Sequence, residues 1–192
     1  MTRPQGSVRR RAAAAGQAPR NKSRRGGGKK GPPPGRSKTT YAVDVRDEQA
    51  HLRIPAARIR QIVRHTLAAE KLAAATISVA LVDNRAIHDL NRRHLKHDYE
   101  TDVLSFLFDA EPEFAASSTG PRGKGRRIDG EIVISAEMAV QSASQFDWSP
   151  AEELTLYLVH GLLHLCGYDD LTEPERRLMR RRERAILKLL GD

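Results

Sequence analysis

One segment of the chain, Ser149 to Gly167, constrains the fold more than any other. Ser149 is a good N-cap, Pro150 takes the first helical position, and Glu152 falls three residues after the cap, which is a capping-box pattern. The residues that follow are apolar nearly all round the helix, so the helix should be buried. Gly167 comes just after the last apolar residue and suits a left-handed C-terminal cap. The core of the protein is therefore expected to form around this helix.

Two histidines interrupt the apolar surface of this helix. His160 and His164 are four residues apart, so they share a face and can point two imidazoles at one zinc ion. Buried imidazoles without partners are costly, which favours a shared ligand. Asp170 follows six residues later and completes H-x-x-x-H-x-x-G-x-x-D, the metzincin ligand spacing with aspartate as the last donor. The pattern predicts zinc on these three residues, and Asp169 remains the alternative third ligand.

The neighbours of the two histidines restrict the chemistry. Zinc proteases carry a glutamate after the first histidine as general base, but this chain has Gly161, which argues against ordinary peptide hydrolysis. No other general base is fixed by the sequence. Cys166 should point away from the histidines and fill the core. As a single cysteine it excludes an internal disulfide framework and fits a reducing cytoplasm.

The rest of the body alternates strands and helices before it ends in helices. Expected strands are Thr40–Val45, Ala75–Asp83, Asp102–Phe108 and Gly130–Ser135. Expected helices start at Pro55 and run to about Leu72, run from an Asn84 cap to about Leu95, and cover Ala136–Gln145 and Glu173–Leu190. The segment 111–127 should be an exposed loop. This order predicts an α+β fold, a small mixed sheet of about four strands packed with helices, with the HxxxH helix buried at its centre.

Charge divides the chain into two parts. Residues 1–40 carry twelve Lys and Arg and no acidic residue, and the remainder has 21 basic against 24 acidic residues. With seven glycines and five prolines, residues 1–38 are expected to be a disordered basic tail before a single domain, 39–192. The tail is interpreted as an electrostatic arm for RNA or as a solubilising or wrongly assigned extension. It lacks the apolar region of a secretory signal and only weakly resembles a transit peptide, and no apolar run predicts a membrane span.

The histidine segment also carries a family resemblance. "HGLLHLCGYDD", residues 160–170, agrees at ten of eleven positions with H-G-x-L-H-L-x-G-Y-D-H, the pattern of the YbeY family of bacterial endoribonucleases and rRNA maturation factors. "TDVLSF" and "GEIVIS" are similar to two further segments of that family, in the same order. The resemblance covers roughly Val43 to Leu190. It implies a cytoplasmic, single-strand-specific endoribonuclease with one zinc on His160, His164 and Asp170, acting on the 3′ end of 16S rRNA and in quality control of the small ribosomal subunit.

The chain departs from the family pattern at two places. Asp170 replaces the usual third histidine. Leu95 stands where the family commonly has an arginine, so a phosphate contact is expected from Lys96 or His97, or from neither. Asp102 and Glu131, at two strand starts, are candidates to support the metal site from outside the ligand set, with a solvated strand end as the alternative.

Two other functions compete with the ribonuclease. One is a zinc hydrolase of another substrate, such as a peptidase. The other is a ribosome-associated RNA-binding protein with a structural metal. That protein would hold phosphate through the tail and the basic face of the last helix. The alternative is that this helix face is only a solvated surface. The arginines of the face are Arg176, Arg177, Arg180, Arg181 and Arg182. Cleavage itself could proceed by attack of a metal-bound water or of the ribose 2′-OH.

Overall fold

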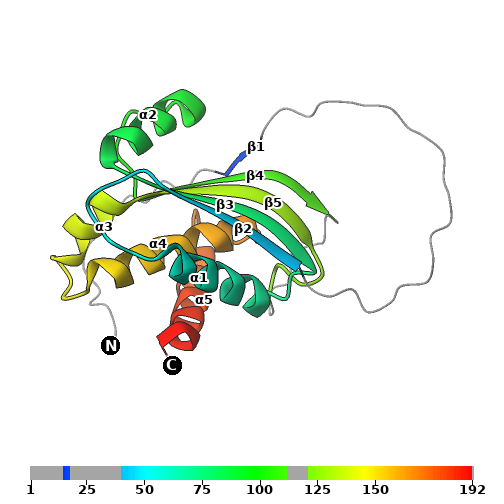
Figure 1. Cartoon of the computed structure of the whole chain (residues 1–192). Coiled ribbons are helices and arrows are strands. Elements are labelled where there is room, and N and C mark those ends of the chain that lie inside the picture. Colours follow the sequence, from blue (N-terminus) through cyan, green and yellow to red (C-terminus); the bar gives the residue numbers. More distant parts are fainter. Residues whose placement is uncertain (1–14, 18–39, 112–120, 192) are drawn as a thin grey trace, which may run out of the picture.

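A mixed β-sheet forms the centre of the molecule (Figure 1). The computed structural model describes residues 15–17, 40–111 and 121–191. Within these ranges five strands occur in the order β1-β4-β5-β3-β2, and their bounds are β1 Ala15–Gln17, β2 Thr40–Asp47, β3 Ala74–Val82, β4 Val103–Glu111 and β5 Arg127–Ser135. Strands β2, β3 and β5 are parallel to one another, and β4 is antiparallel to β5. The expected mixed sheet of an α+β fold is confirmed.

The four expected strands are all present, and β1 is a fifth that the sequence did not indicate. It pairs in parallel with Ser105–Leu107 of β4 at the edge of the sheet. It falls inside the segment that was expected to be a disordered tail. The other residues of that segment lie outside the described part of the chain.

In the described ranges, five helices surround the sheet: α1 Ala56–Ala69, α2 Asn84–Leu95, α3 Ala136–Ala143, α4 Pro150–Leu165 and α5 Glu173–Gly191. Figure 1 shows α1, α4 and α5 on one side of the sheet and α2 on the other. This separation follows from the alternation of side chains along each strand. Ile132 faces the large core around α4, whereas Val133 packs with Ile87 of α2.

Two helix starts differ from expectation. The cap of α2 is Asp83, whose side chain accepts a hydrogen bond of 2.7 Å from Ala86 N, because Asn84 is already helical and its side-chain oxygen accepts from Ser135 Oγ. Pro55 takes the N-cap position of α1 rather than the first helical position. That helix also ends at Ala69, before Leu72, because the chain turns at Lys71, where φ is +58°.

Helix α4 is the buried centre of the fold, as predicted. Ser149 and Glu152 form a complete capping box at its start, and every residue from Leu156 to Leu165 is buried. Gly167 has φ +93°, the expected left-handed conformation, and Cys166 lies fully buried in the core. The capping and burial of α4 therefore fix the positions of its two histidines relative to the sheet. Among the described residues, no helix is both long and apolar enough to cross a membrane.

Candidate metal centre

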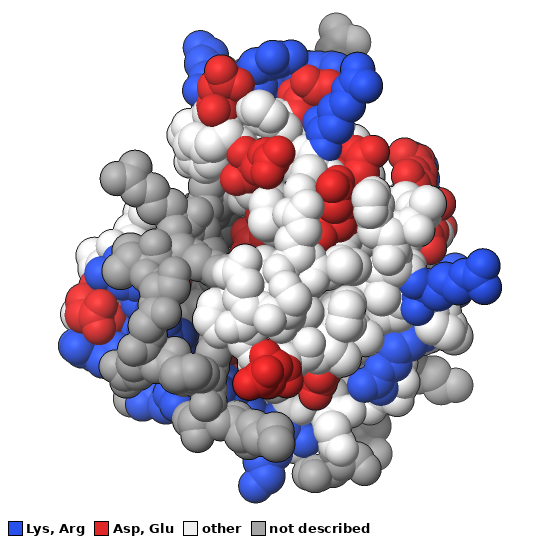
Figure 2. Space-filling model, turned by 90° about the vertical axis from the view of Figure 1, so that its left-hand side faces the viewer, with Lys and Arg blue, Asp and Glu red and all other residues white. Residues whose placement is uncertain are grey.

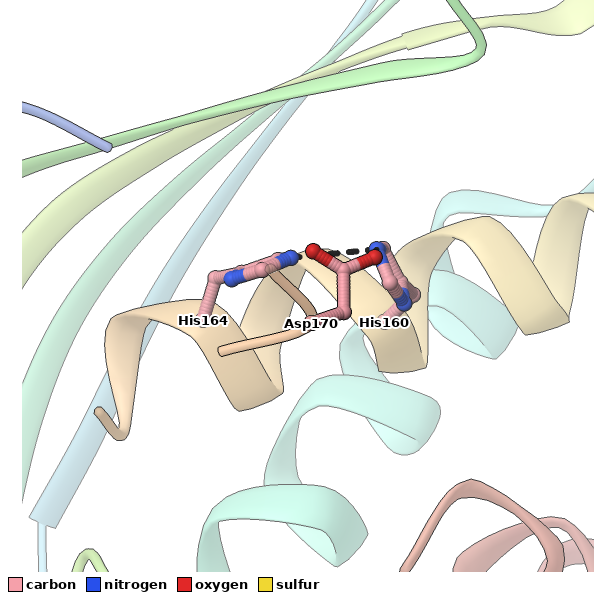
Figure 3. A group of neighbouring side chains, drawn as sticks. All are labelled: His160, His164 and Asp170. Carbon is pink, nitrogen blue, oxygen red and sulfur yellow. Dashed lines mark hydrogen bonds and ion pairs between the residues drawn. The ribbon is translucent and has the colours of Figure 1, made fainter. Parts of the chain in front are cut away.

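Three side chains converge at the C-terminal end of α4 (Figure 3). The Nε2 atoms of His160 and His164 are 3.1 Å apart, and His160 Nε2 lies 4.0 Å from an Asp170 carboxylate oxygen. The three donor atoms all lie within 4.8 Å of one another. Two nitrogens bound tetrahedrally to one zinc at their normal bond lengths would be about 3.3 Å apart. The geometry therefore fits one divalent cation, and two imidazoles with a carboxylate are donors that suit zinc.

The other ring nitrogen of each histidine is also bonded, which fixes both rings. His164 Nδ1 lies 3.0 Å from the carbonyl oxygen of Tyr168, which can only accept, so Nδ1 carries the hydrogen and the neutral ring has its lone pair on Nε2. His160 Nδ1 lies 2.6 Å from a carboxylate oxygen of Glu183 on α5. A hydrogen-bonded partner on the far nitrogen is the usual support of a metal-ligating histidine.

Burial keeps His164 neutral. Burial first, and then the nearby charge of His160, lower the pKa of His164 to about 4, while Asp170 acts in the opposite direction. A histidine must be neutral to bind a metal, so this nitrogen is available at neutral pH. Asp170 is the most exposed of the three, with 19% of its side chain accessible, and it marks the side on which the cluster meets solvent.

A tight turn after α4 delivers Asp170 to the histidines. Gly167 N donates to His164 O and Tyr168 N donates to Leu163 O, which is the Schellman pattern that a left-handed glycine allows. Asp169 serves the same turn, since its Oδ1 accepts from the backbone N–H groups of Asp170 and Leu171. The structure therefore brings Asp170 into the cluster and gives Asp169 a backbone-capping role.

A second set of contacts holds this turn from behind. Tyr168 OH donates at 3.1 Å to Glu70, the fully buried C-cap of α1, and Arg182 of α5 also donates to Glu70. Burial first, and then the charge of Glu70, raise the pKa of Tyr168 to about 12, so its hydroxyl remains a donor. The turn that carries Asp170 is thereby tied to α1 and α5.

Two arginines reach the end of α4 from the segment that was expected to be an exposed loop. Arg122 Nη1 donates to Gly167 O at 2.8 Å, and Arg126 Nη1 donates to Cys166 O at 3.0 Å. Cations at free C-terminal carbonyls are favourable because they complement the helix dipole. The described part of this loop, residues 121–126, is thus packed against the turn. Glu111 and Arg127, the two ends of the expected loop, belong to strands β4 and β5.

The other residues singled out from the sequence lie outside the three-residue cluster. Asp102 accepts from Val103 N at the start of β4, and Glu131 alternates with residues of β5 that face α4, so it points to the opposite side of the sheet. Lys96 is the left-handed C-cap of α2, and the His97 ring stacks on Tyr99. Their expected supporting and phosphate-binding roles stay predictions.

Two buried acids near the cluster were not anticipated. Glu183 and Glu70 are 7% and 0% exposed. The burial of Glu183 could have been predicted from the sequence, because it lies four residues after Met179 and three before Ile186, on the buried face of α5. Arg182 corrects an expectation, since it donates to the buried Glu70 and to Ala69 O and does not lie on an outer basic face.

Comparison with known proteins identifies relatives over most of the chain. The family model described as Endoribonuclease YbeY matches residues 44–191. A protein of Salinibacter ruber is 38% identical over 130 residues, and the alignment covers 68% of this chain and 80% of that protein. A protein of Carboxydothermus hydrogenoformans is 39% identical over 133 residues, and the alignment covers 69% of this chain and 84% of that protein. A protein of Rhodopirellula baltica is 42% identical over 118 residues, covering 60% of this chain and 54% of its own, so the match spans about half of that relative. All three are named Endoribonuclease YbeY.

A solved structure resembles the fold. The solution structure of a Thermotoga maritima protein aligns with a TM-score of 0.50 at 20% identity and covers 77% of this chain and 88% of that one. At this identity the likeness concerns the arrangement of helices and strands alone.

Proposed function

This chain belongs to the YbeY family of endoribonucleases, and from that membership we propose that it is a zinc-dependent, single-strand-specific endoribonuclease. Its proposed role is 3′-end maturation of 16S rRNA and quality control of the small ribosomal subunit, in the cytoplasm. His160, His164 and Asp170 would hold one zinc ion per chain. The observation that carries the proposal is the convergence of two Nε2 atoms and one carboxylate at the buried end of α4.

The chain's own residues define what this site can do. A bound zinc with three protein donors supplies a further coordination position and acidifies a water held there. His160 and His164 stay fixed through their Nδ1 hydrogen bonds, so their lone pairs need no reorientation when the cation binds. Asp170 lies at the solvent-accessible side, where a phosphodiester would approach.

Position 161 favours phosphodiester over peptide substrates. A side chain on Gly161 would meet Ser105 Oγ at 2.9 Å and Val103 Cγ2 at 3.1 Å, because this side of α4 lies against the sheet. A glutamate cannot occupy this position without moving the helix, so the general base of zinc proteases has no place here. This observation supports the nuclease over the peptidase alternative.

Exposed basic residues offer contacts for an RNA backbone. Figure 2 shows Lys and Arg side chains gathered at the top of the molecule, over α2. The exposed cations of this helix and its cap are Arg85, Arg92, Arg93 and Lys96. We propose that Lys96, which is exposed, makes the phosphate contact, whereas His97 is half-buried and its ring stacks on Tyr99.

The test combines metal analysis with RNA cleavage. Purified wild-type protein should contain about one zinc per chain and cleave a single-stranded RNA faster than the same sequence in a duplex. His164→Ala should lose both properties. His65→Ala is the matched control, since His65 is an exposed histidine whose Nδ1 bonds only to its own helix, at Gln61 O.

The outcomes separate the competing functions. Zinc binding with RNA binding but no cleavage would make the metal structural and reject the nuclease. Analysis of the cleaved ends distinguishes attack by water from attack by the 2′-OH, because the two reactions leave the phosphate on different products.

A further inference from the structure

We propose that Glu183 is a positioning residue for the metal centre, which holds the His160 imidazole in the tautomer and orientation that zinc requires. The inference rests on the proposed zinc site and deepens it. Its basis is the 2.6 Å contact between Glu183 Oε1 and His160 Nδ1, made 23 residues apart in the chain between α5 and α4. Both side chains are buried, with exposures of 10% and 2%, so water competes little for this bond.

The contact determines which nitrogen of His160 faces the cluster. A carboxylate only accepts, so Nδ1 must donate and carries a hydrogen. In the neutral ring Nε2 then holds the lone pair, and this is the nitrogen that lies 3.1 Å from His164 Nε2 and 4.0 Å from Asp170. A charged acceptor on the far nitrogen also strengthens the bond that such a ring makes to a metal. Without Glu183, the ring could rotate and exchange tautomers.

The fold holds Glu183 rigidly in this position. Its immediate neighbour Arg182 donates to the buried Glu70 and, at 2.6 Å, to Ala69 O, which fixes α5 against the end of α1. Met179 and Ile186, one turn away on either side, are each 1% exposed and lie in the core. Glu183 therefore stands on a packed face, where a charged side chain is retained only with a partner.

The two histidines are supported in different ways, which makes the proposal testable. The partner of His164 is a backbone carbonyl, which no substitution removes, whereas the partner of His160 is a side chain. Glu183→Leu deletes the acceptor. Glu183→Gln keeps an acceptor oxygen and removes the charge. Glu173→Gln is the matched control, because Glu173 lies exposed on the same helix and pairs with Arg176 and Arg177.

The experiment measures zinc affinity by chelator competition on the full chain prepared without metal. Glu183→Leu should weaken zinc binding by about 10- to 100-fold, Glu183→Gln by less, and Glu173→Gln should match the wild type. Ring ¹⁵N shifts of His160 in the metal-free protein provide a second readout. The wild type and Glu183→Gln should show Nδ1–H, and Glu183→Leu a mixture of tautomers. Thermal unfolding of each metal-free variant verifies that it is folded.

The results distinguish this inference from the proposed function. Equal zinc affinities in the wild type and Glu183→Leu, or an Nε2–H tautomer of His160 in the wild type, would overturn the positioning role and leave the zinc site intact. A wild type that takes up no zinc would overturn the site and the inference together. If Glu183→Leu fails to fold, Glu183→Gln decides: the inference is upheld by weaker zinc binding with the Nδ1–H tautomer retained, and overturned by unchanged affinity.

Discussion

Ser105 of β4 and Gly161 of α4 are in direct contact, and the Ser105 hydroxyl donates a hydrogen bond of 3.1 Å to the Gly161 carbonyl oxygen. A Cβ atom on Gly161 would lie only 2.9 Å from that hydroxyl and 3.2 Å from Ile132 Cγ2. Helix α4 thus approaches the sheet closely because the residue after the first histidine has no side chain. The same contact gives Ser105 a structural role.

Gly161→Ala should therefore destabilise the protein, by about 1–3 kcal/mol of unfolding free energy, as expected for overpacking a core. The loss should appear although alanine is favoured over glycine in a helix by about 1 kcal/mol. Urea unfolding measures it. Gly191→Ala is the control, since a Cβ there meets nothing within 4 Å. A more stable Gly161→Ala variant would contradict the packing argument.

The two neighbouring aspartates should respond differently to the same substitution. Asp170→Asn removes a charged donor from the cluster and should weaken zinc binding. The loss should be at least about tenfold, because even the loss of a residue that only supports a ligand costs about that much. Asp169→Asn keeps the oxygen that accepts from Asp170 N and Leu171 N, so zinc affinity should change little. Chelator competition compares the variants, and the reverse order would make Asp169 the ligand.

Removing the metal should lower thermal stability, because the cation binds only the folded arrangement of donors. At free zinc 100 times the dissociation constant, binding contributes about 2.7 kcal/mol. For a chain of this size the midpoint should then fall by about 5–10 °C when a chelator is added. Differential scanning fluorimetry with and without chelator measures this shift. His164→Ala should melt at the same temperature in both conditions.

Acid should destabilise the metal-free protein through His164. Its folded-state pKa of about 4 lies below the ordinary 6.5. Above pH 6.5 the ring is neutral in both states and has no effect on the pH dependence. Between pH 6.5 and 4 the unfolded chain takes up a proton that the folded chain does not, so stability falls as pH falls and levels off below 4. The shift amounts to about 3 kcal/mol at most.

Urea unfolding across pH 7.5 to 4 measures this loss, with His164→Gln as reference. The difference in unfolding free energy between wild type and variant should shrink toward low pH. A constant difference would show that His164 titrates alike in both states.

Arg182 and Arg181 should differ although they are adjacent arginines. Arg182→Ala leaves the buried Glu70 without its ion-pair partner and should cost about 3–5 kcal/mol. Arg181 is exposed, so Arg181→Ala should stay within about 0.5 kcal/mol of wild type. Urea unfolding compares them. Equal stabilities would place Arg182 among the solvated basic residues, as the sequence had suggested.

The sequence predicted the parts of the fold whose signals are local. Ser149 and Glu152 define the start of α4, and Gly167 defines its end. Each of these residues lies within a few positions of the helix end that it determines. Two of the three candidate donors could be recognised for the same reason, since helical spacing alone places His160 and His164 together. Where two adjacent residues can both cap, as with Asp83 and Asn84, local chemistry does not decide, and the wrong one was chosen.

Contacts between distant elements could not be predicted. The Arg182–Glu70 pair joins residues 112 apart, and it depends on how α5 crosses α1, which the periodicity of either helix leaves open. Glu183 was visible as an acid on an apolar face, but its partner became clear only with α4 in place. Strand β1 pairs through its backbone within a Gly- and Pro-rich segment, whose composition carries no strand signal.

Each residue assigned to the metal centre lies between positions 160 and 183, whereas the last strand of the described sheet ends at Ser135. The residues of the described sheet are therefore all synthesised before the first candidate donor, and Glu183 follows the last candidate donor. A copy that stalls before α5 emerges would have a scaffold without a finished centre.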